Sequence, residues 1–372
     1  MREFIDGNEA IARAAIKAGC NFFAGYPITP ATSILLHMAR ELPKVGGIAI
    51  QGEDEIASIG FCIGAAAVGK RVMTATSGPG ISLYSESIGA AIMIEVPIVI
   101  VDVQRMGPAT GAPTMGAYGD VQFVQWGNSG GYPIIALAPS NVIDCFHLTL
   151  KAFELTERFR TPVFLLTDKE TGLTKTTVDS SQLIGRSTKE NLTDENVNGK
   201  STYKTIKSPG IHPQSLIGGP DITRITTSSH TRDGYLTKDP DAILEHNQHL
   251  TAKIFNHIDE ISMVNYDHQD GSENLIISYG ITVQAVTSAV QKARAQGIRI
   301  SSLAIYSLWP VPEIEIRKAL MKAKKVILPE LNLGLYCREI ERLTSDHHEI
   351  LRLNRLDGGL ISPQEILALV IT

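Results

Sequence analysis

The sequence has few of the features that mark metal-binding, secreted or membrane-spanning proteins. Its four cysteines, Cys20, Cys62, Cys145 and Cys337, lie far apart, and none belongs to a Cys-x-x-Cys pair. This spacing excludes an ordinary zinc or iron–sulfur site carried by this chain alone. It favours reduced, buried thiols in a cytoplasmic protein.

Long apolar runs and an excess of one charge are also missing. The longest apolar stretches, such as residues 96–103, fall far short of the roughly 20 residues of a transmembrane helix, so we expect no membrane segment. Residues 1–9 lack a charged-then-apolar signal pattern. The formal net charge is −5 and no basic stripe is present, which argues against nucleic acid as a partner.

The chain does contain enough apolar sequence for two or three domains. It has 372 residues, of which 43% are hydrophobic and 20% are charged, as in an ordinary globular protein. In the first part, strands predicted at 72–76 and 97–103 alternate with helices predicted at 54–69 and 81–93. Such alternation predicts a parallel sheet with helices on both faces, with ligands at the carboxyl ends of its strands.

The composition changes after the first 173 residues. Residues 174–250 are rich in Ser, Thr, Asn, Asp, Gly and Pro and show little periodicity, which indicates a long excursion that lies across another surface. Residues 251–267 favour a connecting helix, and a second α/β pattern follows it. We therefore predict three parts, bounded at 1–173, 174–267 and 268–372.

Four polar or glycine-rich segments each follow a predicted strand, at residues 25–30, 53–55, 76–80 and 102–108. Because the carboxyl ends of parallel strands share one edge of a sheet, we expect these segments to converge. Their residue types suit catalysis, although each also has a purely structural interpretation.

Two of these segments contain side chains suited to rigid positioning and proton sharing. Prolines on both sides hold the Thr29 hydroxyl in place, or they simply form a stiff connector to the next helix. Glu55 follows Glu53 and Asp54 at a helix N-terminus, where the macrodipole favours carboxylates as caps. A buried glutamate at the edge of an apolar helix is also useful in acid–base chemistry.

The other two segments contain anion-binding groups. Ser77 and Gly78 lie between a strand and a helix, as in an anion-binding helix N-terminus or in a tight structural turn. Their segment is neither a P-loop nor a dinucleotide fingerprint, which counts against a nicotinamide-dependent dehydrogenase. Arg105 suits a two-point grip on a carboxylate, and it equally suits a surface salt bridge.

Taken in order, these motifs resemble the alpha subunits of the 2-oxoacid:ferredoxin oxidoreductases, most closely those of the 2-oxoglutarate type. The motifs are Gly-Tyr-Pro-Ile-Thr-Pro at 25–30, Thr-Ser-Gly-Pro-Gly at 76–80 and Gln-Arg-Met-Gly-Pro-Ala-Thr-Gly at 104–111. Asp168, after a Pro-Val strand start, and Asp-Gly-Gly at 357–359 also fit. The resemblance covers most of the chain.

This resemblance implies a fold, a reaction and a set of partners. The implied fold is an α/β pyrimidine-binding domain for thiamine diphosphate, followed by a smaller transketolase C-terminal-like α/β domain. The implied reaction is oxidative decarboxylation of a 2-oxoacid, here 2-oxoglutarate, to acyl-coenzyme A and carbon dioxide, with electrons passed to ferredoxin. A beta subunit supplies the diphosphate and Mg²⁺ site. Iron–sulfur clusters lie only on partner subunits, with separate gamma and ferredoxin-like delta subunits, so the chain is active only in the complex.

The resemblance also implies roles for particular residues. Glu55 matches the glutamate that meets a ring nitrogen of the cofactor's aminopyrimidine and shares a proton with it. Thr29 and Arg105 match positions that hold the carboxylate of the substrate. The expected cofactor-binding set is Tyr26, Pro27, Ile28, Thr29, Glu55, Ser77 and Gly78.

One departure from the family pattern leaves the substrate open. Residues 128–132 read Asn-Ser-Gly-Gly-Tyr, where family members often have Arg-His-Gly-Asp. If the missing histidine recognises the far end of a substrate, its absence leaves the side-chain specificity open, and pyruvate, branched-chain or aryl 2-oxoacids are alternative substrates. A non-catalytic assembly subunit with the same fold is a further alternative, although Glu55, Thr29 and Arg105 together favour an enzyme.

Overall fold

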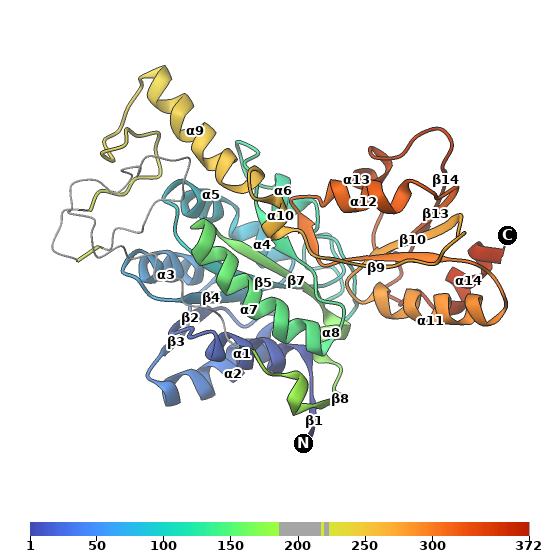
Figure 1. Ribbon diagram of the computed structural model, residues 1–372. Helices are drawn as coiled ribbons and strands as arrows, with labels where there is room; N and C mark the ends of the chain where they lie inside the picture. Colours follow the sequence, from blue (N-terminus) through green and yellow to red (C-terminus); the bar gives the residue numbers. More distant parts are fainter. Residues whose placement is uncertain (186–216, 219–222, 372) are drawn as a thin grey trace.

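The computed structural model describes residues 1–185, 217–218 and 223–371, which form two α/β bodies that lie side by side (Figure 1). The larger body contains the N-terminus and the smaller one the C-terminus. Within this described part of the chain, no helix is both long and apolar enough to cross a membrane.

The larger body is built on a seven-stranded sheet in the order β12-β6-β7-β5-β4-β2-β3. All neighbouring strands pair in parallel except β12, which runs antiparallel to β6. The strands are β2 (Phe22–Gly25), β3 (Ile48–Gln51), β4 (Val72–Thr76), β5 (Ile98–Gln104), β6 (Ile135–Leu137), β7 (Val163–Asp168) and β12 (Ser307–Trp309).

Helices cover both faces of this sheet, as the sequence predicts. Alternate residues of β5 show why, because Val101 joins the core on one face and Ile100 the core on the other. One face carries α1 (Gly7–Lys17), α2 (Thr32–Glu41) and α7 (Val142–Phe159), and the other carries α3 (Glu55–Ala67), α4 (Pro79–Leu83) and α5 (Ser85–Met93).

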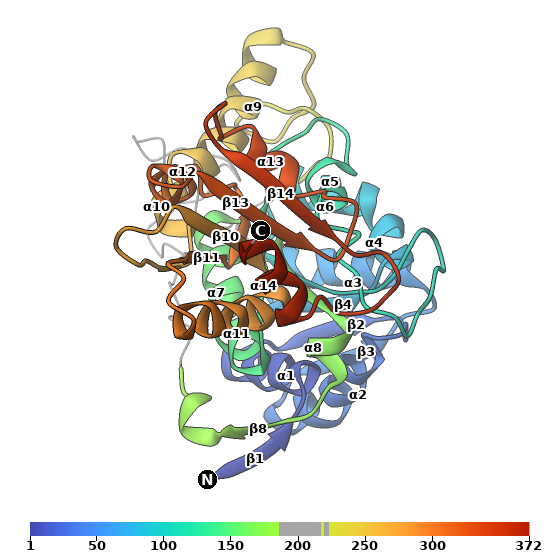
Figure 2. The ribbon, with the colours of Figure 1, turned by 90° about the vertical axis from the view of Figure 1, so that its right-hand side faces the viewer.

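The smaller body has a five-stranded sheet in the order β14-β13-β10-β11-β9, parallel except for β9 (Figure 2). Its strands are β9 (Val264–Asp267), β10 (Asn274–Tyr279), β11 (Ser301–Ile305), β13 (Lys325–Glu330) and β14 (Glu349–Asn354). Its helices are α11 (Thr282–Ala295), α12 (Glu313–Leu320), α13 (Cys337–Glu341) and α14 (Pro363–Ile371).

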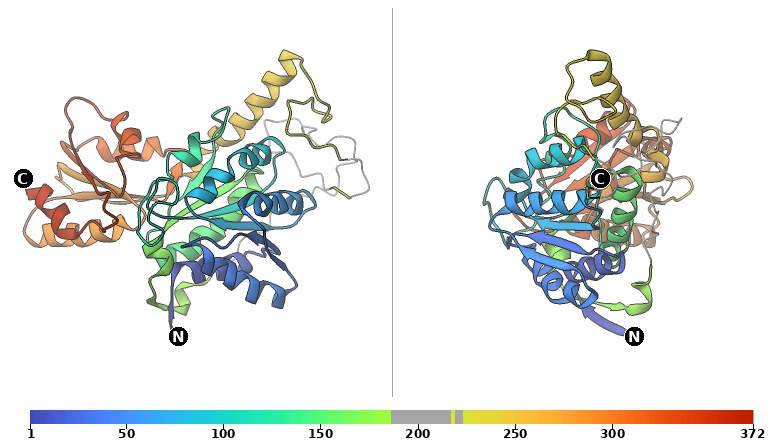
Figure 3. Two further views of the ribbon diagram at one scale, coloured as in Figure 1. Left: turned by 180° about the vertical axis from the view of Figure 1, so that it is seen from behind. Right: turned by 90° about the vertical axis from the view of Figure 1, so that its left-hand side faces the viewer.

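The remaining elements are short, apart from α9, which projects from the larger body (Figure 3). A small antiparallel sheet pairs β1 with β8. These elements are β1 (Arg2–Ile5), β8 (Thr176–Asp179), α6 (Phe123–Trp126), α8 (Lys169–Leu173), α9 (Pro240–Phe255), α10 (Ile258–Ile261) and the 3-10 turns Leu42–Val45 and Ser180–Gln182.

The prediction of a single connecting helix over 251–267 is wrong. Helix α9 begins at Pro240 because Asp239 accepts a hydrogen bond from the Ala242 backbone N–H, and it ends at Phe255. Residues 264–267 form β9, whose partner β11 is distant in the sequence. Much of the excursion predicted at 174–267 lies outside the described residues.

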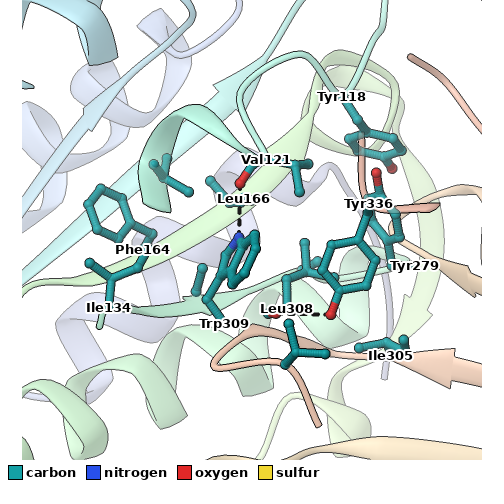
Figure 4. Close-up of a cluster of buried hydrophobic side chains, with 14 of the residues drawn as sticks. Tyr118, Val121, Ile134, Phe164, Leu166, Tyr279, Ile305, Leu308, Trp309 and Tyr336 are labelled. Atoms are coloured by element: carbon teal, nitrogen blue, oxygen red, sulfur yellow. Dashed lines mark hydrogen bonds between the residues drawn. The ribbon is translucent and has the colours of Figure 1, made fainter. Parts of the chain in front are cut away.

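A shared core joins the two bodies (Figure 4). Trp309 of β12 donates from Nε1 to the Val121 carbonyl at 2.9 Å, and Tyr336 donates to the Leu308 carbonyl at 2.9 Å. Segment 118–122, which follows the Arg105 loop, is thereby held against the C-terminal body. The three domain bounds proposed from the sequence stay a prediction.

Candidate active site

The four segments chosen from the sequence converge at the carboxyl edge of the larger sheet. Arg105, after β5, donates from Nη1 to the Thr29 carbonyl at 2.7 Å, which links the β5 loop to the turn after β2. A Cβ added to Gly78 would lie 3.7 Å from Cγ of Arg105, so the turn after β4 touches the same side chain. The topology of the parallel sheet explains this convergence.

Glu55 is the first residue of α3 and is only 7% exposed. The capping alternative applies to Asp54, whose carboxylate accepts from the Ala57 backbone N–H at 2.7 Å. The Glu55 side chain lies against the turn after β4, because a Cβ on Gly80 would be 2.9 Å from Cγ of Glu55. Glycine at position 80 therefore lets the carboxyl group approach this edge closely.

Arg105 and Thr29 differ in their exposure to solvent. Arg105 is 6% exposed, whereas Thr29 is exposed. Burial lowers the pKa of Arg105, and the charges of Asp120, Glu55 and Asp102 oppose that shift, in decreasing order. Its Nε donor is shielded from solvent and has no hydrogen-bond partner among the described residues. One donor of the guanidinium therefore holds the chain, while another remains available for an anionic ligand.

The other expected cofactor-binding residues lie in the turns after β2 and β4. Tyr26 is 37% exposed, and Pro27 and Ile28 are half-buried, with Ile28 against the core. Ser77 is buried and its hydroxyl oxygen has no hydrogen-bond partner. Gly78 has φ +37°, in the region that favours glycine.

Several buried polar atoms at this edge have no partner, which is uncommon in folded proteins and requires an explanation. Among the described residues, they are the Thr76 and Ser77 hydroxyl oxygens and Nε of Arg105. A polar ligand bound at this edge would satisfy some of them. The residues present therefore fit a bound cofactor with ring nitrogens and an amino group.

Two acids at this site were not predicted from the sequence. Asp102, on β5, is fully buried, and burial raises its pKa well above the usual range, with the nearby Asp120 carboxylate adding to the shift. Burial likewise raises the pKa of Asp120 to about 6. One feature of the sequence could have identified Asp102, which is the single acid in the apolar run 97–103. An unpaired acid is unusual in a central strand.

Asp168 ends β7, and the segment at 128–132 precedes β6. Asp168 caps α8 by accepting from the Thr171 N–H at 2.9 Å, and it also accepts from the Tyr118 hydroxyl at 2.9 Å. Residues 128–130 and 132 line a cavity of about 710 Å³ beside α5. Neither Glu55, Thr29 nor Arg105 belongs to that cavity lining.

The two bodies match two family models. Residues 13–247 match the thiamine-diphosphate-binding domain of pyruvate flavodoxin/ferredoxin oxidoreductases, and residues 272–366 match core domain II of pyruvate:ferredoxin oxidoreductase. Among the residues that the structure describes, no group of three or more His, Cys, Asp or Glu side chains is placed to hold a metal ion.

Curated relatives match nearly the whole chain. The chain is 41% identical to the 2-oxoglutarate synthase subunit KorA of Methanocaldococcus jannaschii, with 98% of both chains covered. It is 35% identical to the ketoisovalerate oxidoreductase subunit VorB of Methanothermobacter thermautotrophicus, covering 98% of this chain and 96% of that one.

Solved structures are also similar to this chain. The 2-oxoglutarate:ferredoxin oxidoreductase from Magnetococcus marinus, solved with 2-oxoglutarate, coenzyme A and succinyl-CoA bound, is 32% identical with a TM-score of 0.91. This chain is covered completely and spans 65% of that chain. A split-gene transketolase, at 11% identity and a TM-score of 0.57, shares the fold alone, with 99% of this chain and 98% of that chain covered.

The fold class and the resemblance expected from the motifs are thereby confirmed. The order of the motifs, the site at the carboxyl edge of the parallel sheet and the full-length similarity all lead to one assignment. The chain belongs to the pyruvate flavodoxin/ferredoxin oxidoreductase family, as a thiamine-diphosphate-binding subunit of the kind found in 2-oxoglutarate synthases.

Proposed function

We propose that this chain is the alpha subunit of a 2-oxoacid:ferredoxin oxidoreductase and binds the aminopyrimidine end of thiamine diphosphate. The observation that carries the proposal is the placement of Glu55. Its carboxyl group is buried at the start of α3, at the same sheet edge where Arg105 is held by the Thr29 carbonyl. A proton-sharing acid and a carboxylate-binding cation thus lie at one edge.

Glu55 has the chemistry needed to hold the pyrimidine ring. When bound, thiamine diphosphate supplies the carbon nucleophile and the electron sink for decarboxylation. Glu55 shares a proton with a ring nitrogen of the aminopyrimidine, and burial keeps water from competing for that hydrogen bond. Tyr26, Pro27 and Ile28 form one wall of the cofactor pocket, and Ser77 and Gly78 form its rim.

Arg105 and Thr29 bind the substrate carboxylate in this proposal. The Thr29 carbonyl fixes one arm of the guanidinium at 2.7 Å, and Nε has no other partner to compete with a ligand. A fixed guanidinium loses little side-chain entropy when it binds a planar carboxylate. The exposed Thr29 hydroxyl provides a second donor on the same side of the site.

The substrate that we propose is 2-oxoglutarate. Four relatives named as 2-oxoglutarate synthase subunits are 38% to 41% identical, whereas those named as ketoisovalerate oxidoreductase subunits are 34% and 35% identical.

The same proposal includes partner subunits. A beta subunit supplies the diphosphate and Mg²⁺ site, and iron–sulfur clusters on partner subunits pass electrons to ferredoxin. Separate gamma and ferredoxin-like delta subunits complete the complex. Support comes from relatives that are themselves named as subunits. The four free, buried cysteines of this chain suit a cytoplasmic complex.

An open apolar face of α3 is where we place the beta subunit. Ile56 and Phe61 are 54% and 47% exposed, and a Cβ on Gly60 or Gly64 would meet no atom within 4 Å. A helix that is apolar on all sides is normally buried on all sides. The face begins at Ile56, next to Glu55, so a subunit docked there reaches the far end of the same cofactor.

Replacement of Glu55 tests the proposal. The Glu55→Gln complex, reconstituted with its partner subunits, is expected to lose at least about a hundredfold of its turnover, because glutamine cannot share the proton. Turnover is measured with a panel of 2-oxoacids, coenzyme A and a viologen dye, with exposed Glu53→Gln as the matched control. Wild-type turnover of Glu55→Gln would contradict the role of Glu55.

A further inference from the structure

Asp102 is a fully buried acid in the middle of the larger sheet. On β5 it lies opposite Thr76 of β4 and Leu166 of β7, so strands flank it on both sides. Within the described part of the chain, neither carboxyl oxygen accepts a hydrogen bond from an N–H or hydroxyl group. An isolated carboxylate in such a place would be very unfavourable, so the group requires a counterpart.

That counterpart is a second acid. The Asp102 side chain shares a hydrogen bond with Asp120, whose Oδ2 atom is also shielded from solvent. Two ionised carboxylates cannot form this bond, because neither carries a donor. A contact between the two carboxyl groups therefore needs one shared proton. The N–H of Gly78 acts on the same carboxyl, with poorer geometry.

Asp120 is also fastened to the strand end that carries Arg105. Its backbone N–H donates to Oε1 of Gln104 at 3.1 Å, and Gln104 in turn donates to the Thr167 carbonyl at 3.3 Å. Two links thus join segment 118–122 to the end of β5, one through Gln104 and one through Asp102. Arg105 is the next residue along the chain.

The opposite side of segment 118–122 is fastened to the C-terminal body. The Tyr118 N–H donates to the Leu331 carbonyl at 3.0 Å, and Asn332 donates to the Tyr118 carbonyl at 3.0 Å. Gln122 donates to the Leu335 carbonyl at 2.8 Å. The segment therefore connects the smaller body to the candidate site.

We propose that Asp102 and Asp120 hold one proton between them and act as positioning residues for Arg105. The acid pair fastens segment 118–122, and with it the C-terminal body, to the strand end from which Arg105 reaches Thr29. One negative charge remains on the pair, and it balances the buried guanidinium. The inference rests on the proposed role of Arg105 in holding the substrate carboxylate.

A donor-retaining and a donor-lacking substitution separate positioning from simple core packing. Asp102→Asn keeps an N–H donor toward Asp120, and its assembled complex is expected to have an oxoacid KM within about twofold of wild type. Asp102→Leu keeps similar volume but leaves Asp120 without a donor. Its KM is expected to rise about tenfold, because the buried Asp120 carboxylate would be left without a hydrogen-bond donor. The change in kcat is expected to be smaller. Equal KM values for the two variants would overturn the positioning role.

Infrared spectroscopy of the assembled complex tests the shared proton directly. The wild-type minus Asp102→Asn difference spectrum should contain the carbonyl stretch of a protonated carboxylic acid, and its absence would overturn the acid pair. Glu330→Gln is the control, since Glu330 is another buried acid, in the C-terminal body. It should remove a different acid band and leave the oxoacid KM unchanged.

Two further outcomes are distinguishable. If Asp102→Leu does not assemble, Asp120→Leu, on a half-buried segment, replaces it and should raise KM in the same way. A wild-type complex without oxoacid turnover would refute the proposed function, whereas the acid band would still report on the pair. A normal KM in Asp120→Leu would overturn the positioning role.

Discussion

Glu95 is a fully buried acid that Lys253 holds in its charged form. Burial alone would raise its pKa, but Lys253, at 3.0 Å, and His249, at 3.0 Å, bring it well below the usual range. Lys253 also donates to the Arg160 carbonyl at 3.0 Å. The ion pair of Glu95 and Lys253 therefore attaches the projecting helix α9 to the chain at the end of α5.

Replacing Lys253 with methionine should therefore destabilise the protein. The buried Glu95 carboxylate would lose its cation, at a cost of about 3–5 kcal/mol in the free energy of unfolding. Glu95→Gln in the same chain should restore much of the loss. Urea denaturation followed by circular dichroism measures the effect. Lys151→Met, at a half-buried pair with Glu154, should cost less than about 1 kcal/mol. Equal costs for the two variants would contradict the argument.

The stability from Glu95 should also depend on pH. Because its folded-state pKa is depressed, this contribution is fully present above its unfolded pKa of about 4.3 and is lost as the pH falls further. Wild type should lose more stability than Glu95→Gln between about pH 5 and pH 3. Parallel stability–pH curves for the two proteins would show that Glu95 is not held ionised.

At the scale of single elements, α3 combines two functions. Its first residue is Glu55, and its exposed face carries Ile56, Gly60, Phe61 and Gly64. The opposite face packs on β2 and β4 through Ile59 and other buried side chains. In the proposed function, one helix thus places the proton-sharing carboxylate and the surface on which the beta subunit docks.

A charge on the open face of α3 should block assembly without unfolding the chain. Phe61→Asp is expected to lose co-purification with the beta subunit, because a desolvated charge at an apolar interface costs several kcal/mol. Its thermal unfolding should stay close to wild type, since Phe61 is 47% exposed. Met321→Asp, on a residue 73% exposed in the smaller body, should assemble normally. Assembly of Phe61→Asp would place the beta subunit elsewhere.

At the scale of the whole molecule, the two bodies share one core. Strand β12 follows β11 of the smaller sheet but adds to the larger sheet beside β6. Trp126 and Trp309 are the only tryptophans, and their rings meet edge to face at 6.3 Å at this joint. The intrinsic fluorescence of the chain therefore reports on the joint itself.

We expect the two bodies to unfold as one cooperative unit. Because the joint is part of a continuous core, the fluorescence and far-ultraviolet circular dichroism transitions in urea should coincide. Trp126→Phe leaves the buried Trp309 as the only fluorescent indole and should show the same midpoint. A fluorescence midpoint well below that of circular dichroism would mean that the joint opens before the bodies unfold.

Much of the fold was readable from the sequence because local patterns carry it. The strand predicted at 72–76 has the bounds of β4, and the helix predicted at 54–69 contains α3. The helix predicted at 81–93 is divided at Tyr84 into α4 and α5. Periodicity reports which side chains face a core, but it does not show where packing divides a helix.

The sequence by itself determined the family, the parallel sheet and the convergence of Thr29, Glu55 and Arg105, because motif order and strand ends are local features. Only the tertiary structure decided that β12 joins the larger sheet and that Asp102 meets Asp120. The first contact joins strands that are distant in the sequence. The second joins a residue of β5 to a residue of a later loop. They form because packing removes water from both partners, and no local pattern records that event.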